Sequence, residues 1–148
     1  MEHKKATEYT LKATSNYIPS ERMYSSTDAV KFARQFYHDD ICIYESSFIL
    51  LLNQANMVIG WAKISQGGLT SVVVDVRLIA KIAIDALATG VVFVHNHPSG
   101  NMKASPQDIA LSKRISEGLA LLDIRLLDSI IIGPDQSKFY SCNDEGDL

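Results

Sequence analysis

The sequence predicts an α/β fold in which a mixed β-sheet is flanked by helices on both faces. Short apolar segments with strand-like patterns alternate along the chain with longer segments of helical periodicity, and this interleaving is typical of α/β layers. The chain has 148 residues, of which 47% are hydrophobic and 21% charged, so it is globular rather than disordered. It shows no repeat and no inter-domain linker. A single domain of ordinary size is therefore expected.

Local patterns predict each element in turn. Residues 1–24 are expected to form an irregular N-terminal arm, with a candidate strand at 8–13, and residues 25–148 to form the domain. Ser26 is predicted to cap the first helix, and Gly90 to follow the end of the second. A polar turn at 53–56 joins two strands as a hairpin, and 65–68 is a flexible break. The helices are predicted at 27–37, 75–89 and 106–122, and the strands at 47–52, 57–64, 91–94, 124–127, 129–132 and 139–141.

Composition narrows the function classes. No apolar run approaches the length of a membrane span, and the first residues lack the apolar core of a signal peptide. Cys42 and Cys142 are too far apart for a local motif and too few for a disulfide framework, which favours a reducing cytoplasm. The net charge is −3 and no basic run exceeds two residues, so strong binding to duplex DNA is not expected. No membrane partner is expected, and the sequence leaves homo-oligomerisation open.

The chemistry of the chain is concentrated after the apolar run 91–94, which ends directly in two histidines spaced by one residue. Alternate side chains of an extended backbone share a face, so His95 and His97 can aim at one point, and Pro98 helps to keep the pair extended. Asp108 follows after a glycine-containing loop, near a predicted helix start. Two imidazoles and a carboxylate suit a zinc ion that keeps its fourth position open for water, which is typical of catalytic zinc. A single histidine is often only a polar residue at a strand end, but a pair at this spacing favours ligands.

Helix capping offers a second explanation for part of this pattern. Ser105 is a good N-cap, Pro106 suits the first helical position, and Asp108 falls at the third, where a carboxylate opposes the helix dipole. Capping alone would account for these residues. Both roles are compatible, because a helix start is also a fixed platform for a ligand.

A zinc hydrolase also needs a base near the attacking water, and a histidine cannot serve while it binds the metal. Glu45 is the candidate because it directly precedes the strand expected at 46–52 of the same sheet. A solvated charge at a strand end is an equally good explanation of Glu45. Ser105 is a candidate to aim its hydroxyl at a developing oxyanion, beyond its role as a cap.

The pattern of these residues resembles the signature of the JAMM (MPN-domain) metalloproteases. The segment His95-x-His97-Pro98-Ser99-Gly100 is followed by Ser105-x-x-Asp108, with Glu45 upstream. Asn96 and Gly100, together with Leu127-Asp128 and Ile130-Ile131-Ile132-Gly133, look specifically like the bacterial RadC family. The similarity runs from about Tyr24 to the C-terminus.

The resemblance implies a fold, a cofactor and roles for the site residues. The fold would be a mixed sheet between helices, related in layout to the zinc deaminases. Zinc would be held by His95, His97 and Asp108, while Glu45 would polarise the water and Ser105 would support the tetrahedral intermediate. Longer relatives carry an N-terminal helix-hairpin-helix region associated with DNA binding, and this chain is expected to be a short form without it. Ser129 stands where relatives usually have histidine.

The leading interpretation is a zinc-dependent peptidase or isopeptidase that acts on a peptide or protein substrate. The alternative is a DNA-repair or mobile-element accessory protein whose metal site is vestigial or serves binding, and the acidic charge counts against it. A nucleoside-type deaminase requires His-x-Glu and Pro-Cys-x-x-Cys segments, and the sequence has neither.

Overall fold

The computed structural model describes residues 5–8, 13–14, 18–67 and 73–148. Most of the candidate strand at 8–13 therefore lies outside the described residues. Further along the expected arm, Arg22 forms a β-bridge with Met57, and Met23 is buried in the core. None of the described helices is long and apolar enough to span a membrane.

One five-stranded sheet organises the chain, with the spatial order β2-β1-β3-β4-β5. Strands β3 and β4 are parallel, and the other neighbouring pairs are antiparallel, so the sheet is mixed as predicted. The five strands are β1 Ser46–Leu52, β2 Val58–Gln66, β3 Gly90–Asn96, β4 Arg125–Ile132 and β5 Phe139–Ser141.

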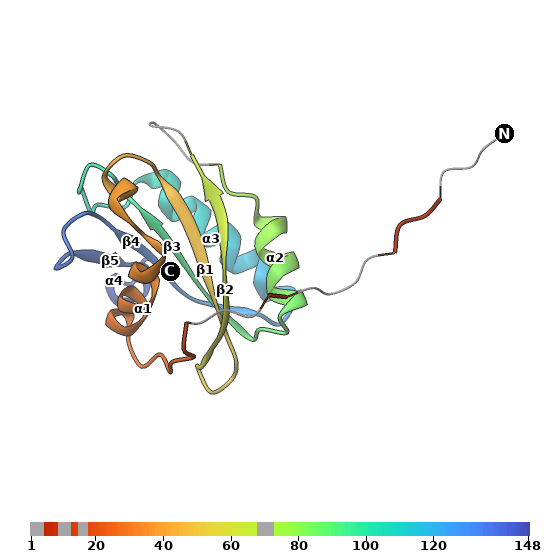
Figure 1. The fold of residues 1–148 in the computed structure, drawn as a ribbon. Coiled ribbons are helices and arrows are strands. Elements are labelled where there is room, and N and C mark those ends of the chain that lie inside the picture. The colour runs from red at the N-terminus through yellow and green to blue at the C-terminus, as the bar shows by residue number, and fades with distance from the viewer. Residues whose placement is uncertain (1–4, 9–12, 15–17, 68–72) are drawn as a thin grey trace.

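Helices cover both faces of the sheet (Figure 1), which confirms the predicted α/β layers. Alternate residues of the central strand β3 serve the two sides: Val92 and Val94 pack in the α1 cluster, whereas Val91 and Phe93 pack in the cluster that includes α2 and α3. Every residue of β3 is buried for this reason, and its sequence is almost continuously apolar. The helices are α1 Ser26–Ala33, α2 Val76–Asp85, α3 Pro106–Ala120 and α4 Cys142–Glu145, with 3₁₀ turns at Arg34–Phe36 and Asp39–Cys42.

Several predicted helix ends differ from the structure. Ser25, not Ser26, is the N-cap of α1, because its N–H donates to the Asp28 carboxylate at 3.1 Å. Helix α1 ends at Ala33, and the chain continues as a 3₁₀ turn. Helix α2 ends at Asp85, four residues earlier than predicted.

The early end of α2 has a local cause. Leu87 adopts a left-handed conformation with φ 55°, and the N–H of Ala88 donates to the Ala83 carbonyl at 2.9 Å, which closes the helix in a Schellman motif. Gly90, expected just past the helix, instead begins β3.

The two strands predicted at 124–127 and 129–132 are one continuous strand, β4. Asp128, which lies between the two predicted strands, is buried within β4, and its carboxylate accepts hydrogen bonds from the Ser141 hydroxyl at 2.5 Å and the Asn143 N–H at 3.0 Å. These partners offset part of the cost of burying the carboxyl group inside the sheet. The edge strand predicted at 139–141 is confirmed as β5.

The topology brings three chain segments to one edge of the sheet. The carboxyl ends of the parallel strands β3 and β4 lie together, and the antiparallel strand β1 begins at the same edge, with Ser47 opposite His95. Glu45, which directly precedes β1, therefore lies beside the two histidines.

Candidate metal centre

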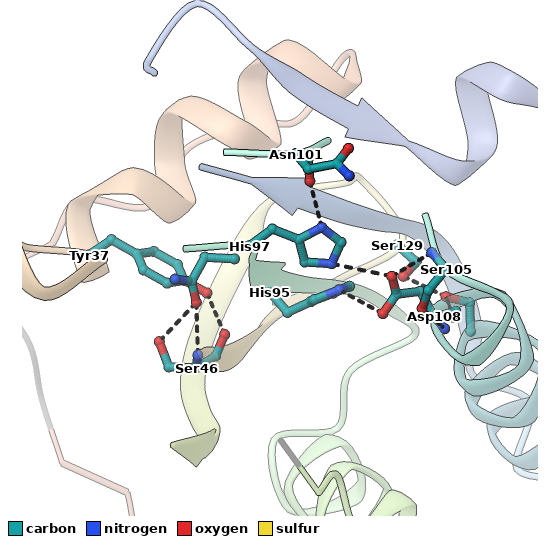
Figure 2. A network of polar contacts seen from close by, with 10 residues as sticks. Tyr37, Ser46, His95, His97, Asn101, Ser105, Asp108 and Ser129 are labelled. Carbon is teal, nitrogen blue, oxygen red and sulfur yellow. Dashed lines mark hydrogen bonds and ion pairs between the residues drawn. The ribbon is translucent and has the colours of Figure 1, made fainter. Parts of the chain in front are cut away.

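The two histidines lie at the end of β3 on the face that carries α3. His95 is 7% exposed and packs against Phe93, with ring centroids 5.7 Å apart. His97 follows the strand, and its ring meets that of His95 edge-on at a centroid distance of 5.1 Å. Both rings point toward Asp108 (Figure 2). The spacing of two residues along an extended backbone thus directs His95 and His97 to one point, as predicted.

Asp108 reaches both histidines from the first turn of α3. Its Oδ1 lies 3.2 Å from Nε2 of His95, and its Oδ2 lies 3.2 Å from Nε2 of His97. The same side chain completes the helix cap: the Ser105 N–H donates to Asp108 Oδ2 at 2.8 Å, and the Asp108 N–H donates to Ser105 Oγ at 3.1 Å. Pro106 occupies the start of the helix as predicted. The capping box therefore fixes Asp108 where it contacts the histidine pair.

His97 is oriented by a backbone group that the sequence did not reveal. Its Nδ1 lies 2.7 Å from the Asn101 carbonyl oxygen (Figure 2). A carbonyl only accepts, so Nδ1 carries the proton, and in the neutral ring Nε2 presents its lone pair to Asp108. The loop returns to His97 through Gly100, whose φ of 82° favours glycine, and this glycine is the one sequence signal for the reversal.

Asp108 and His97 shift each other's pKa in opposite directions. Burial by itself would raise the pKa of Asp108, but the contacts with His95 and His97 and the N–H of Ser105 outweigh it and bring that pKa below its ordinary range. The contact with Asp108 raises the pKa of His97, against burial, which lowers it. The carboxylate thus favours a positive charge beside it.

The donor set fits a metal ion. Neither ring nitrogen of His95 has a hydrogen-bond partner among the described residues, although both are buried. Each Nε2 faces an Asp108 carboxylate oxygen at 3.2 Å. A lone pair on the nitrogen repels the lone pairs of that oxygen unless a proton or a cation lies between the two atoms. Glu45 also offers an oxygen within 4.8 Å of ligand atoms of His95 and His97, so these three could themselves share an ion. Two nitrogens with carboxylate oxygens suit a divalent transition metal.

A serine pair fastens the first turns of α3 to β4. The Ser112 hydroxyl donates to the Asp108 carbonyl at 2.9 Å, and the Ser112 and Ser129 hydroxyls lie 2.7 Å apart. Both serines are buried. Ser129, noted in the sequence as a departure from the usual histidine, is thus paired with Ser112 within the fold.

The structure brings together all five predicted site residues at one edge of the sheet: Glu45, His95, His97, Ser105 and Asp108. The assignments of three as metal ligands and two as catalytic groups stay predictions. The sequence did not indicate that the Asn101 carbonyl orients His97, although the contact spans only four residues and Gly100 lies within it.

Comparison with known proteins places this geometry in a family. Residues 23–147 match the family model of the RadC-like JAB domain. A UPF0758 protein of Flavobacterium johnsoniae is 41% identical over 103 residues, and one of Porphyromonas gingivalis is 42% identical over 102 residues. These matches cover 70% and 69% of the chain and 44% of each relative, so the chain spans less than half the length of the curated relatives it matches.

The family match extends over nearly the whole described domain, including the strand, loop and helix that carry the histidines and Asp108. The chain therefore belongs to the RadC-like JAB domain family.

Proposed function

We propose that this domain is a zinc-dependent hydrolase that cleaves a peptide or isopeptide bond in a peptide or protein substrate. The observation that carries the proposal is His95: a buried imidazole without a hydrogen-bond partner for either nitrogen among the described residues, 3.2 Å from the Asp108 carboxylate and within reach of Glu45. Such an arrangement is costly to bury unless a proton or a metal ion lies between the imidazole and the carboxylate, and the approach of Glu45 to the same pair favours the metal ion. Membership of the JAB domain family supports the same conclusion.

His95, His97 and Asp108 would hold the ion. When bound, zinc would supply a Lewis acid that lowers the pKa of water and polarises the scissile carbonyl. The Asn101 carbonyl keeps the Nδ1 proton of His97 in place, so Nε2 would be available to the ion as a neutral ligand. The cap at Ser105 keeps the Asp108 carboxylate from turning away.

Glu45 and Ser105 would act on the reacting groups. A carboxylate oxygen of Glu45 takes the proton from the attacking water and passes it to the leaving amine nitrogen. Ser105 Oγ accepts the Asp108 N–H, which leaves its own proton to donate to the oxygen that becomes negative during attack. Both groups lie beside the histidine pair, at the start of β1 and the start of α3.

The test is Glu45→Gln, with zinc content and turnover measured together. Glutamine keeps the shape of the side chain but cannot accept the proton, so zinc content and folding should stay nearly unchanged while the rate falls by about 10²–10⁴. Glu117→Gln, which removes the same charge from the exposed face of α3, is the matched control and should keep full activity.

Turnover is assayed on a panel of fluorogenic peptides and isopeptide-linked ubiquitin-like substrates. Full activity in Glu45→Gln would assign the base to another group. An absence of wild-type cleavage across the panel, with zinc bound, would contradict the hydrolase proposal.

A further inference from the structure

Asn96 lies between the two histidines, and its side chain points to the opposite face of the sheet. It is fully buried. Its Nδ2 donates to the carbonyls of Ile41 at 2.8 Å and Tyr44 at 2.9 Å, and its Oδ1 accepts the N–H of Ser46 at 2.8 Å. Carbonyls only accept and a backbone N–H only donates, so these partners fix the orientation of the amide. Both ends of the Asn96 side chain are therefore committed to one other segment of the chain.

That segment carries Glu45. Two of the three backbone groups held by Asn96 belong to the residues on either side of it, Tyr44 and Ser46. Two further bonds fasten the same stretch: the Tyr37 hydroxyl donates to the Ser46 carbonyl at 2.9 Å (Figure 2), and the Gly67 N–H donates to the Glu45 carbonyl at 2.8 Å. Glu45 itself precedes β1, so the regular ladder of the sheet begins one residue too late to hold it.

We propose that Asn96 is a positioning residue that holds the Glu45 carboxylate at the histidine pair. The inference rests on the proposed role of Glu45 as the base. Asn96 shares consecutive peptide bonds with His95 and His97, so its clamp ties Glu45 to the strand that carries both histidines. The two histidines and the base would therefore keep their relative positions if β3 moved. An error of about 1 Å in the position of a reacting group can lower the rate about 10²-fold. Hydrogen bonds that fix the position of Glu45 would prevent such a loss.

Few side chains can replace this clamp. It requires two donors and one acceptor on a short planar group, which an asparagine amide provides. Aspartate keeps the acceptor for Ser46 but turns an oxygen toward the Ile41 and Tyr44 carbonyls. Asn96→Asp is therefore the informative variant, because it keeps the volume and removes the two donations. Asn96→Ser, which keeps one hydroxyl for the same segment, is the milder variant if the aspartate variant does not fold.

The first experiment uses metal-free protein and no substrate. Amide hydrogen exchange reports the Gly67 N–H, which is bonded to the Glu45 carbonyl. Loss of the clamp should speed its exchange about five- to tenfold, the effect of one lost hydrogen bond on a local opening. Asn53→Asp is the matched control: Asn53 accepts the N–H groups of Ala55 and Met57 in the turn at the far end of the β1–β2 hairpin. It should leave the Gly67 exchange unchanged. Full protection of Gly67 in both Asn96 variants would overturn the proposal.

The second experiment asks whether Asn96 acts through Glu45. Asn96→Asp should keep stoichiometric zinc and nearly unchanged KM, with kcat lowered about 10–100-fold. In a Glu45→Gln background the same change should cost almost nothing more, because the group it positions is already disabled. Losses that multiply would show that Asn96 acts independently of Glu45. If the wild type cleaves nothing, the proposed function fails, and the Gly67 exchange still decides whether the clamp exists.

Discussion

Asp108 is proposed to serve two purposes, as partner in a helix cap and as metal ligand, and two substitutions should separate them. Ser105→Ala removes the oxygen that accepts the Asp108 N–H at 3.1 Å, so it damages the cap and leaves the proposed metal ligands in place. Such a loss costs about 1 kcal/mol of unfolding free energy, or roughly 2–4 °C in Tm for a chain of this size. The decrease should be similar with and without zinc, because the carboxylate of Asp108 is untouched.

Asp108→Asn should give the opposite result. Ser105 still accepts the N–H of residue 108, and an amide oxygen can replace the carboxylate oxygen that accepts the Ser105 N–H at 2.8 Å. The cap should therefore survive, and the metal-free Tm should lose only what the ionised carboxylate contributes beside the histidines. The variant loses the negative charge that lies 3.2 Å from Nε2 of both histidines, and zinc affinity should fall at least about 100-fold.

Thermal unfolding in chelator and in excess zinc measures both effects. Zinc at a free concentration 100 times the wild-type Kd adds about 2.7 kcal/mol to the folded state, or roughly 5–10 °C in Tm. A 100-fold weaker site leaves about 0.4 kcal/mol of this stabilisation, close to 1 °C. A full zinc-induced rise in Asp108→Asn would refute the ligand assignment.

Three further predictions concern the ligands, the surface and a buried acid. His97→Ala should lose tight zinc binding, so elemental analysis of the purified variant should find well below the roughly one zinc per chain expected of the wild type. The wild type should show no sub-micromolar affinity for labelled duplex DNA in fluorescence anisotropy at physiological salt, because its net charge is −3. Burial raises the pKa of Asp128 despite its hydrogen bonds, so the ionised carboxyl costs stability as the pH rises above about 3.9. The unfolding free energy of Asp128→Asn relative to the wild type should therefore increase from about pH 4 to about pH 7 in urea titrations; a constant difference would contradict the raised pKa.

The types of the elements were predictable, and several of their ends were not. Periodicity identifies a helix over many residues, but the end of α2 depends on the left-handed conformation of Leu87, which leucine rarely adopts. The nearest glycine, Gly90, was the wrong marker for this reason. The continuity of β4 through Asp128 depends on Ser141 and Asn143. These residues lie further along the chain, so the local sequence around Asp128 does not reveal their contacts.

The same distinction applies to the site. The histidine pair and the cap at Ser105 each depend on neighbours in the sequence, so their spacing predicted them. The arrangement of Glu45 depends on the pairing of β1 with β3, in which Ser47 lies opposite His95, and on the bonds from Asn96. No local pattern encodes these contacts between distant segments, so the clamp was visible only in the fold.

The proposed ion-holding groups all come from one uninterrupted stretch, from His95 to Asp108, whereas Glu45 comes from a different part of the chain. The proposed uptake of the ion and the proposed cleavage of a bond thus depend on separate segments of one domain. A descendant that lost Glu45 would keep its strand, loop and helix and would still take up the ion. Such a protein would be suited to sensing or scaffolding, and the segment from His95 to Asp108 would still identify its family.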